Sequence, residues 1–219
     1  MELDENRVMQ ETLRYLGYGR KQPDAQVAAL LTDCMEELKG AVSCRHVKRE
    51  SPLEFFGENG IRTELFSAES RNLKKNLKDC GQVLVFAATV GIGADQLIQR
   101  YERFRVSRAV VFQAMAAAVI EEYCDSLNRR WREEYEARGL YLRPRFSPGY
   151  GDFPLECQRE ILERLEAGKK IGLTLTDSLI MMPSKSVTAV IGVSRIPAGC
   201  AVEGCEACGK KDCPYRRDG

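Results

Sequence analysis

Residues 82–90, QVLVFAATV, give the strongest indication of the fold of this chain, because seven of these nine residues are apolar. An apolar run of this length is typical of a buried strand, and we predict one here. The strand is followed by TVGIGADQ, residues 89–96, where Gly91 and Gly93 fit an ordinary turn into a helix. A dinucleotide-binding fingerprint would need a third glycine, and Gln96 stands in its place.

Helical patterns lie on both sides of this strand in the sequence. Residues 94–104 favour a helix, and residues 107–136 favour a long one, with an apolar, alanine-rich first half in the core and a charged second half in solvent. Upstream, residues 24–38 repeat apolar side chains at helical spacing, with Asp24 as the expected N-cap and Gly40 as the expected stop.

The remaining patterns alternate strands with short helices. Strands are expected within residues 41–50, 60–66 and 187–195, a short helix after a serine cap within 67–80, and a further helix over about 155–167. The order has no regular strand–helix–strand rhythm. The fold class that we predict is therefore α+β.

Composition excludes several classes of function. The chain has 219 residues, of which 44% are apolar and 30% charged, so we expect a soluble globular domain, with or without an appendage. A formal net charge of +1 argues against a nucleic-acid partner. No apolar run reaches membrane-spanning length, and the polar N-terminus does not resemble a signal peptide, so we expect a cytoplasmic protein without a membrane partner.

The nine cysteines, without a secretion signal, point to free thiols or metal binding in a reducing compartment. Four of them form the pattern C-x4-C-x2-C-x4-C in the segment 197–219, which has no hydrophobic period: Cys200, Cys205, Cys208 and Cys213. Four thiolates so close together can bind zinc or an iron–sulfur cluster. We predict a domain over 1–196 and a metal-binding tail over 197–219; the alternative is a disordered, thiol-rich tail.

His46 and the other five cysteines carry weaker signals. His46 lies in an alternating, charged strand pattern without companion ligands nearby, so we expect it to be structural. Cys34 and Cys124 fall on helix faces that are expected to be buried, where thiols behave as small apolar groups. Cys44, Cys80 and Cys157 stand alone, and we expect them to be structural as well.

A binding loop is predicted at residues 145–154, RFSPGYGDFP. Pro148 and Gly149 form a turn pair that holds Tyr150 at a fixed angle. Arg145, five residues before Tyr150, can reach back toward the same space, and its planar guanidinium suits a carboxylate. Gly151 lets a ligand approach the backbone closely. These residues favour a clamp for a small molecule that carries an anionic group and a flat or cationic one; the alternative is a rigid structural corner.

Two motifs in this region resemble a known family. The first is R-x-x-P-G-Y-x-x-x-P, carried by Arg145, Pro148, Gly149, Tyr150 and Pro154. The second is L-T-x-S-x-x-M-x-P-x-x-S-V, carried by Leu175, Thr176, Ser178, Met181, Pro183, Ser186 and Val187. In this order and spacing they resemble the activation domain of cobalamin-dependent methionine synthase, over roughly residues 84–192. The alanine-rich helix with Glu121 fits the same pattern.

The resemblance implies an α+β fold with a mixed, mainly antiparallel twisted sheet and helices packed on it. It implies that the loop binds S-adenosylmethionine and that the partner is a cobalamin-binding methionine synthase or a related corrinoid protein. A flavodoxin- or ferredoxin-like donor would return stalled cob(II)alamin to cob(I)alamin. The sulfonium methyl would then restore methylcobalamin on the partner.

The resemblance also implies roles for single residues. Arg145 would hold the ligand's carboxylate, and Tyr150, the expected catalytic residue, would lie beside the methyl or the sulfonium. The backbone around the loop would line adenine or ribose, at Pro148, Gly149, Gly151 and Phe153. Glu121 or Glu122 would offer negative charge toward the sulfonium. The family's pattern has further carboxylates near the ligand, where this chain has Ala117 and Gly139.

This chain lacks cobalamin, folate and homocysteine modules, so we expect a free-standing activation subunit that acts in trans. The cysteine tail is not part of the family's usual domain. An iron–sulfur cluster there would place a one-electron supply near cobalt. The alternative function is a non-catalytic docking or assembly module for a corrinoid methyltransferase, with a zinc-stabilised tail.

Overall fold

The structure is a computed structural model that describes residues 4–19 and 21–197. Its helices are α1 (Glu5–Tyr15), α2 (Ala25–Ala41), α3 (Arg71–Asn76), α4 (Ile92–Glu102), α5 (Val106–Glu136), α6 (Cys157–Leu165) and α7 (Ala167–Ile171). Its strands are β1 (Arg45–Pro52), β2 (Glu54–Phe56), β3 (Gly60–Arg62), β4 (Ser67–Glu69), β5 (Cys80–Thr89), β6 (Tyr141–Leu142), β7 (Thr174–Leu175), β8 (Met181–Met182) and β9 (Ser186–Ser194).

The central sheet has the strand order β1-β5-β9-β6, and each neighbouring pair is antiparallel. Two small antiparallel sheets accompany it, one from β2, β3 and β4 and one from β7 and β8. Helices and mainly antiparallel sheet therefore combine in an α+β fold, which confirms the fold class predicted from the sequence.

Strand β5 lies inside the sheet and is buried on both faces. Leu84, Phe86 and Ala88 belong to the core beneath α5, whereas Val83 and Val85 point into the core that α6 and α7 cover. Both faces of the strand therefore need apolar side chains, which explains why seven of the nine residues over 82–90 are apolar.

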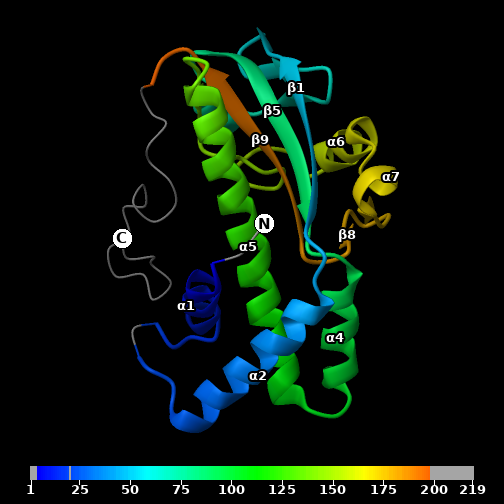
Figure 1. The fold of residues 1–219 in the computed structure, drawn as a ribbon. Helices are drawn as coiled ribbons and strands as arrows, with labels where there is room; N and C mark the ends of the chain where they lie inside the picture. Colours follow the sequence, from blue (N-terminus) through cyan, green and yellow to red (C-terminus); the bar gives the residue numbers. More distant parts are fainter. Residues whose placement is uncertain (1–3, 20, 198–219) are drawn as a thin grey trace.

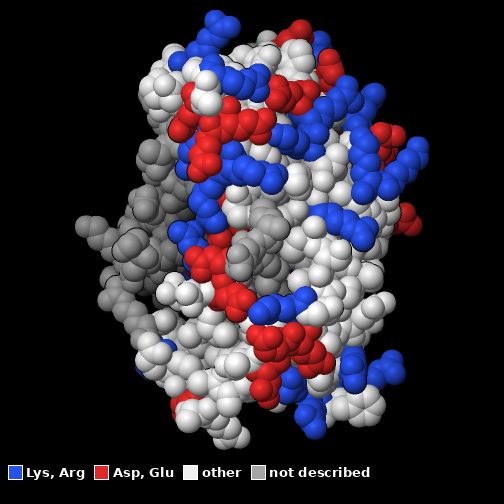
Figure 2. Space-filling view, viewed as in Figure 1, with Lys and Arg blue, Asp and Glu red and all other residues white. Residues whose placement is uncertain are grey.

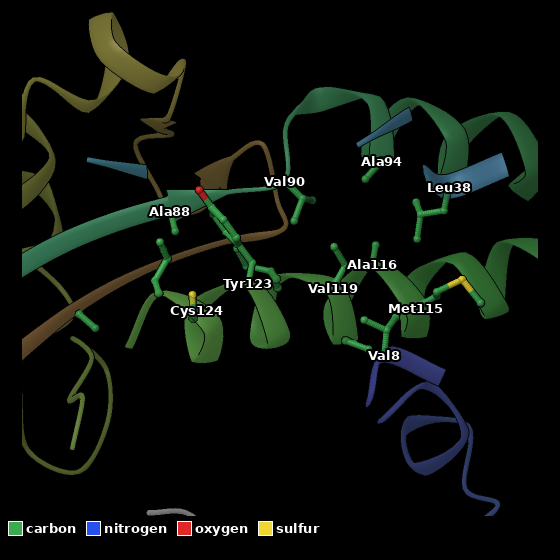
Figure 3. Close-up of a cluster of buried hydrophobic side chains, with 14 of the residues drawn as sticks. Val8, Leu38, Ala88, Val90, Ala94, Met115, Ala116, Val119, Tyr123 and Cys124 are labelled. Atoms are coloured by element: carbon green, nitrogen blue, oxygen red, sulfur yellow. The ribbon is translucent and has the colours of Figure 1, made fainter. Parts of the chain in front are cut away.

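Helix α5 runs along one face of the sheet, while α6 and α7 lie on the other side (Figure 1). The first half of α5 is also enclosed by α1, α2 and α4. Figure 3 shows Val8 of α1, Leu38 of α2 and Ala94 of α4 gathered around Met115 and Ala116 of α5. The small side chains in this part of α5 let four helices pack closely together.

The prediction of a solvated second half of α5 was wrong. Leu127, Trp131 and Tyr135 are fully buried there, and the indole of Trp131 packs edge-on against Phe86 of β5. The hydroxyl of Tyr135 donates a hydrogen bond to Glu50 of β1. Bulky residues spaced one turn apart form a narrow buried stripe, which the many charged neighbours mask in the sequence.

The turn from β5 into α4 requires glycine at both Gly91 and Gly93. Gly91 has φ +85°, a conformation that other residues rarely adopt, and a side chain at Gly93 would collide with the backbone carbonyl of Ala41. The interpretation of TVGIGADQ as a structural turn is therefore confirmed. The same close approach fixes the start of α4 against the end of α2.

Several predicted boundaries were wrong. Helix α1 was not predicted at all, although Asp4 caps it and Val8 and Thr12 are buried. Helix α2 begins after its predicted cap Asp24 but continues through Gly40 to Ala41. Within the strand predicted over 60–66, only Gly60–Arg62 pair in β3, because Thr63 turns the chain by accepting hydrogen bonds from the Leu65 and Phe66 amides.

Charges of both signs are interspersed over the face seen in Figure 2. Among the described residues, no helix is long and apolar enough to cross a membrane. Cys34, Cys80, Cys124 and Cys157 are buried as free thiols, and Cys44 is partly buried. Burial raises the pKa of Cys34 and of Cys44 to about 11, so these thiols are held in the neutral form.

Candidate functional site

The predicted binding loop begins where β6 ends, at the edge of the central sheet. The chain stays beside β9 for four more residues: the Arg143 amide donates to Gly192 at 2.8 Å, and Phe146 exchanges hydrogen bonds with Val190 at 2.9 Å. This edge pairing sends successive side chains to opposite faces of the sheet. Arg145 therefore faces α5, whereas Phe146 joins the core beneath α6 and α7.

Asp152 anchors the loop to the start of α3. Its carboxylate accepts hydrogen bonds from the Ser70 hydroxyl at 2.5 Å and from the amides of Arg71 and Asn72 at 2.9 and 3.0 Å. The Ser70 bond and the two amide bonds lower the pKa of Asp152 and satisfy donors that a helix leaves open at its start. Gly151 has φ +59°, a conformation that other residues rarely adopt, and a Cβ there would displace the side-chain amide of Asn72.

Phe153 fixes the end of the loop from inside the core. It is 1% exposed and packs on Phe66 with ring centroids 5.4 Å apart. Its carbonyl accepts a hydrogen bond from the Gly149 amide at 2.8 Å, which closes the loop on itself. The ring of Phe153 is therefore a structural anchor, and its amide is also used inside the loop, where it donates to the Tyr150 carbonyl at 3.1 Å.

Tyr150 is the loop residue presented to solvent. Its side chain is 69% exposed, and its ring leans edge-on against Phe146, with centroids 5.3 Å apart at 78°. The turn Pro148–Gly149 precedes it, with Gly149 at φ +85°. A large exposed aromatic ring on a loop fixed by core and helix contacts is available to a ligand.

Arg145 forms two short ion pairs with α5. Its Nη1 lies 2.5 Å from Asp125 Oδ1, and its Nη2 lies 2.7 Å from Glu121 Oε2. Burial alone would lower the pKa of Arg145, but the charges of Asp125 and Glu121 together raise it. The guanidinium is thus permanently charged and held in one orientation. Two of its five N–H groups are used in these bonds, which leaves donors for a ligand.

Glu121 and Glu122 face different neighbours. Glu121 joins Arg145, whereas Glu122 is buried against Arg129 at 2.6 Å and lies 4.0 Å from Arg7 of α1. Of the two predicted glutamates, only Glu121 is brought to the loop. Sequence reasoning missed Asp125, although its position four residues after Glu121 places both carboxylates on one helix face.

A cavity of about 540 Å³ opens beside Tyr150, on the α3 side of the loop. Its walls come from α3 and the residues that follow it and from the start of the loop: Asn72, Lys75, Asn76, Lys78, Asp79, Arg143, Pro144, Phe146 and Tyr150. Arg145, which we expected to reach the same space as Tyr150, lies outside the lining of this cavity.

The predicted metal ligands Cys200, Cys205, Cys208 and Cys213 lie outside the described residues. Within residues 4–19 and 21–197, no group of three or more histidine, cysteine or acidic side chains is placed to hold a metal ion. His46 bonds instead to the Tyr123 hydroxyl at 2.8 Å and packs against Trp131, in line with its predicted structural role.

The chain was compared with models of known protein families and with solved structures. A family model described as the activation domain of vitamin B12-dependent methionine synthase matches residues 72–198, which include the loop and both motifs. Among solved structures, the chain is similar to the MetH reactivation domain bound to AdoHcy, with a TM-score of 0.64 and 17% identity. The match covers 91% of this chain and 76% of that one. At this identity the likeness establishes the fold.

Proposed function

The chain belongs to the family of vitamin B12-dependent methionine synthase activation domains, and from that premise we propose that it binds S-adenosylmethionine for remethylation of a corrinoid on a partner protein. The observation that carries the proposal is the loop 145–154. It keeps its motif residues, and Asp152 and Phe153 fix it rigidly while Arg145 and Tyr150 remain presented at the sheet edge.

In the proposed complex, Arg145 binds the α-carboxylate of the ligand through the N–H groups that its ion pairs leave open. Glu121 and Asp125 hold the guanidinium in place and supply negative charge nearby for the ligand's ammonium or sulfonium. The ring of Tyr150 attracts the cationic sulfonium through its face. The backbone at Pro148, Gly149 and Gly151 lines the adenosine.

The protein's contribution is orientation. A corrinoid on the partner would supply the nucleophilic cobalt, reduced by one electron from a flavodoxin- or ferredoxin-like donor, and S-adenosylhomocysteine would leave as the product. A loop fixed at both ends presents the methyl group in a defined direction, which is what transfer between two bound reactants requires. In this proposal the chain acts as an activation subunit in trans.

The test is calorimetric titration of S-adenosylmethionine into the wild-type chain and into Arg145→Ala. We expect saturable binding that the substitution abolishes. Arg129→Ala is the matched control, because it removes a 2.6 Å ion pair to Glu122 of the same helix, whereas Arg145 pairs with Glu121 and Asp125. Circular dichroism of each variant reports whether the fold is intact.

Absence of binding by the wild type, alone and with a corrinoid partner, would overturn the proposal in favour of a docking or assembly module. That module predicts that Arg145→Ala leaves partner binding and partner activity unchanged. If binding is found, an assay of partner methionine synthase recovery from the cob(II)alamin state tests the remethylation step directly, with Arg129→Ala again as the control.

A further inference from the structure

We propose that the cavity between α3 and the loop is a second binding site, which takes a mononucleotide: a phosphate together with a flat ring. The proposal does not rest on S-adenosylmethionine binding: Arg145 does not line this cavity, and Tyr150 is the one residue that both proposed sites use. A volume of about 540 Å³ is within the range of small-molecule pockets.

The charge of the lining residues selects an anion. Lys75, Lys78 and Arg143 line the cavity, against the single carboxylate of Asp79. Lys75 and Lys78 have no ion-pair partner in the part of the chain that the structure describes. Three cations around one hollow would repel each other less when a phosphate lies between them, and guanidinium and ammonium groups are the usual ligands of phosphate.

Arg143 makes this a built site instead of a chance grouping of surface lysines. The residue is only 8% exposed, and its Nη2 donates to the backbone carbonyl of Lys78 at 3.2 Å. This bond fixes the guanidinium relative to the end of α3, where Lys75 and Lys78 lie. One cation of the cavity is therefore held in place before any ligand arrives, which reduces the entropic cost of binding.

Asn76 offers a further point of recognition. Its amide nitrogen donates to the Pro144 carbonyl at 3.3 Å, while its Oδ1 is buried without a hydrogen-bond partner. A buried acceptor without a donor is destabilising. Asn76 lines the cavity, so a rotation of its side chain would bring Oδ1 to an N–H or O–H of a ligand there. A nucleoside supplies such donors on both its ribose and its base.

The remaining wall suits a flat ring. Phe146 and Tyr150 line the cavity, and their rings meet edge-on at 5.3 Å. Tyr150 leaves most of its ring exposed, and stacking of a base on such a ring is favourable for any base. The cationic side of the cavity suits a phosphate and the aromatic side suits a base, and a mononucleotide carries both groups.

The experiment is calorimetric titration of the full chain with the common ribonucleoside 5′-monophosphates and flavin mononucleotide, with inorganic phosphate and the nucleosides alone as separate arms. We expect at least one nucleotide to bind about tenfold or more tightly than phosphate or its own nucleoside. If no nucleotide binds, or if phosphate binds as tightly as every nucleotide, the proposal is wrong.

Variants locate the binding. Lys75→Ala with Lys78→Ala removes two exposed cations of the cavity, and we expect nucleotide affinity to fall about tenfold. Lys169→Ala with Lys170→Ala is the matched control, because it removes the same charge from exposed positions of another short helix, α7. Equal affinity in the two double variants would overturn the assignment. Arg145→Ala should keep nucleotide binding, which separates this site from the proposed S-adenosylmethionine site.

Discussion

The carboxylate of Asp152 accepts a hydrogen bond from the hydroxyl of Ser70 at 2.5 Å, and this contact joins the predicted binding loop to the start of α3. Ser70 is itself the N-cap of α3, since its Oγ accepts from the Leu73 amide at 3.0 Å. One pair of side chains therefore holds both the helix and the loop. The rigidity of the loop depends on a segment far away in the sequence.

Asp152→Ala should release the loop. We expect a thermal midpoint a few degrees lower and weaker binding of S-adenosylmethionine, because the amides of Arg71 and Asn72 lose their acceptor. Asp177→Ala, at an exposed position of the β7–β8 turn, is the control. Equal melting and binding of the two variants would show that the cap does not support the loop.

Asp125→Ala should weaken S-adenosylmethionine binding by about tenfold, because Arg145 loses a charge-assisted bond that orients it. The change is read by calorimetry. Glu133→Ala removes a carboxylate from an exposed position of the same helix and should bind like the wild type. Tighter binding by Asp125→Ala would instead mean that Asp125 competes with the ligand for Arg145.

Two glycine substitutions should act in opposite directions on stability. Gly93→Ala would drive a methyl group into the Ala41 carbonyl, so we expect a loss of about 3 kcal/mol or failure to fold. Gly40→Ala, inside α2 with open space around it, should stabilise the chain by about 0.5–1 kcal/mol. Urea unfolding measures both. A neutral Gly93→Ala would contradict the close approach of α2 and α4.

His46 should make stability depend on pH. Burial, helped by the charges of Arg130 and Lys48, lowers its pKa below the ordinary value of 6.5. As the pH falls through about 6.5, the unfolded chain takes up a proton that folded His46 does not, so the free energy of unfolding decreases. His46→Gln should reduce this loss when urea unfolding is compared at about pH 7.5 and about pH 5.5. Identical pH dependence in both proteins would exclude the effect.

The cysteine tail should bind a metal when the protein is purified without oxygen. An iron–sulfur cluster would give a brown protein with visible absorbance, whereas zinc would be colourless and found only by elemental analysis. Cys205→Ser together with Cys208→Ser should abolish metal binding. Metal-free wild-type protein would contradict the prediction, and zinc without iron would exclude a cluster as the electron source.

Much of the fold could be predicted because its signals are local. The apolar run at 82–90 became β5 (Cys80–Thr89), and the pattern over 107–136 became α5 (Val106–Glu136). The spacing of apolar residues and the positions of turn residues are features of short sequence segments, so helices and strands can be predicted from them without knowledge of the fold. The two motifs likewise indicated the family, since their residues are close in sequence.

The partners of the site residues could not be predicted in the same way. Arg145 was expected to reach toward the space around Tyr150, but it bonds to Glu121 and Asp125 of α5. No role was predicted for Asp152, and its contact with Ser70 appeared only in the fold. Each of these contacts joins segments that the sheet edge brings together.

The sequence by itself determined most of the longer elements, the family and the loop that carries the motif. Only the tertiary structure decided which face of the loop each side chain serves, placing Arg145 against α5 and Tyr150 beside the cationic cavity. The physical reason is the pairing of Phe146 with Val190 of β9, because the neighbouring side chains of Arg145 and Phe146 then point to opposite faces, and Tyr150 packs on Phe146. That pairing depends on contacts between distant segments, which local patterns do not encode.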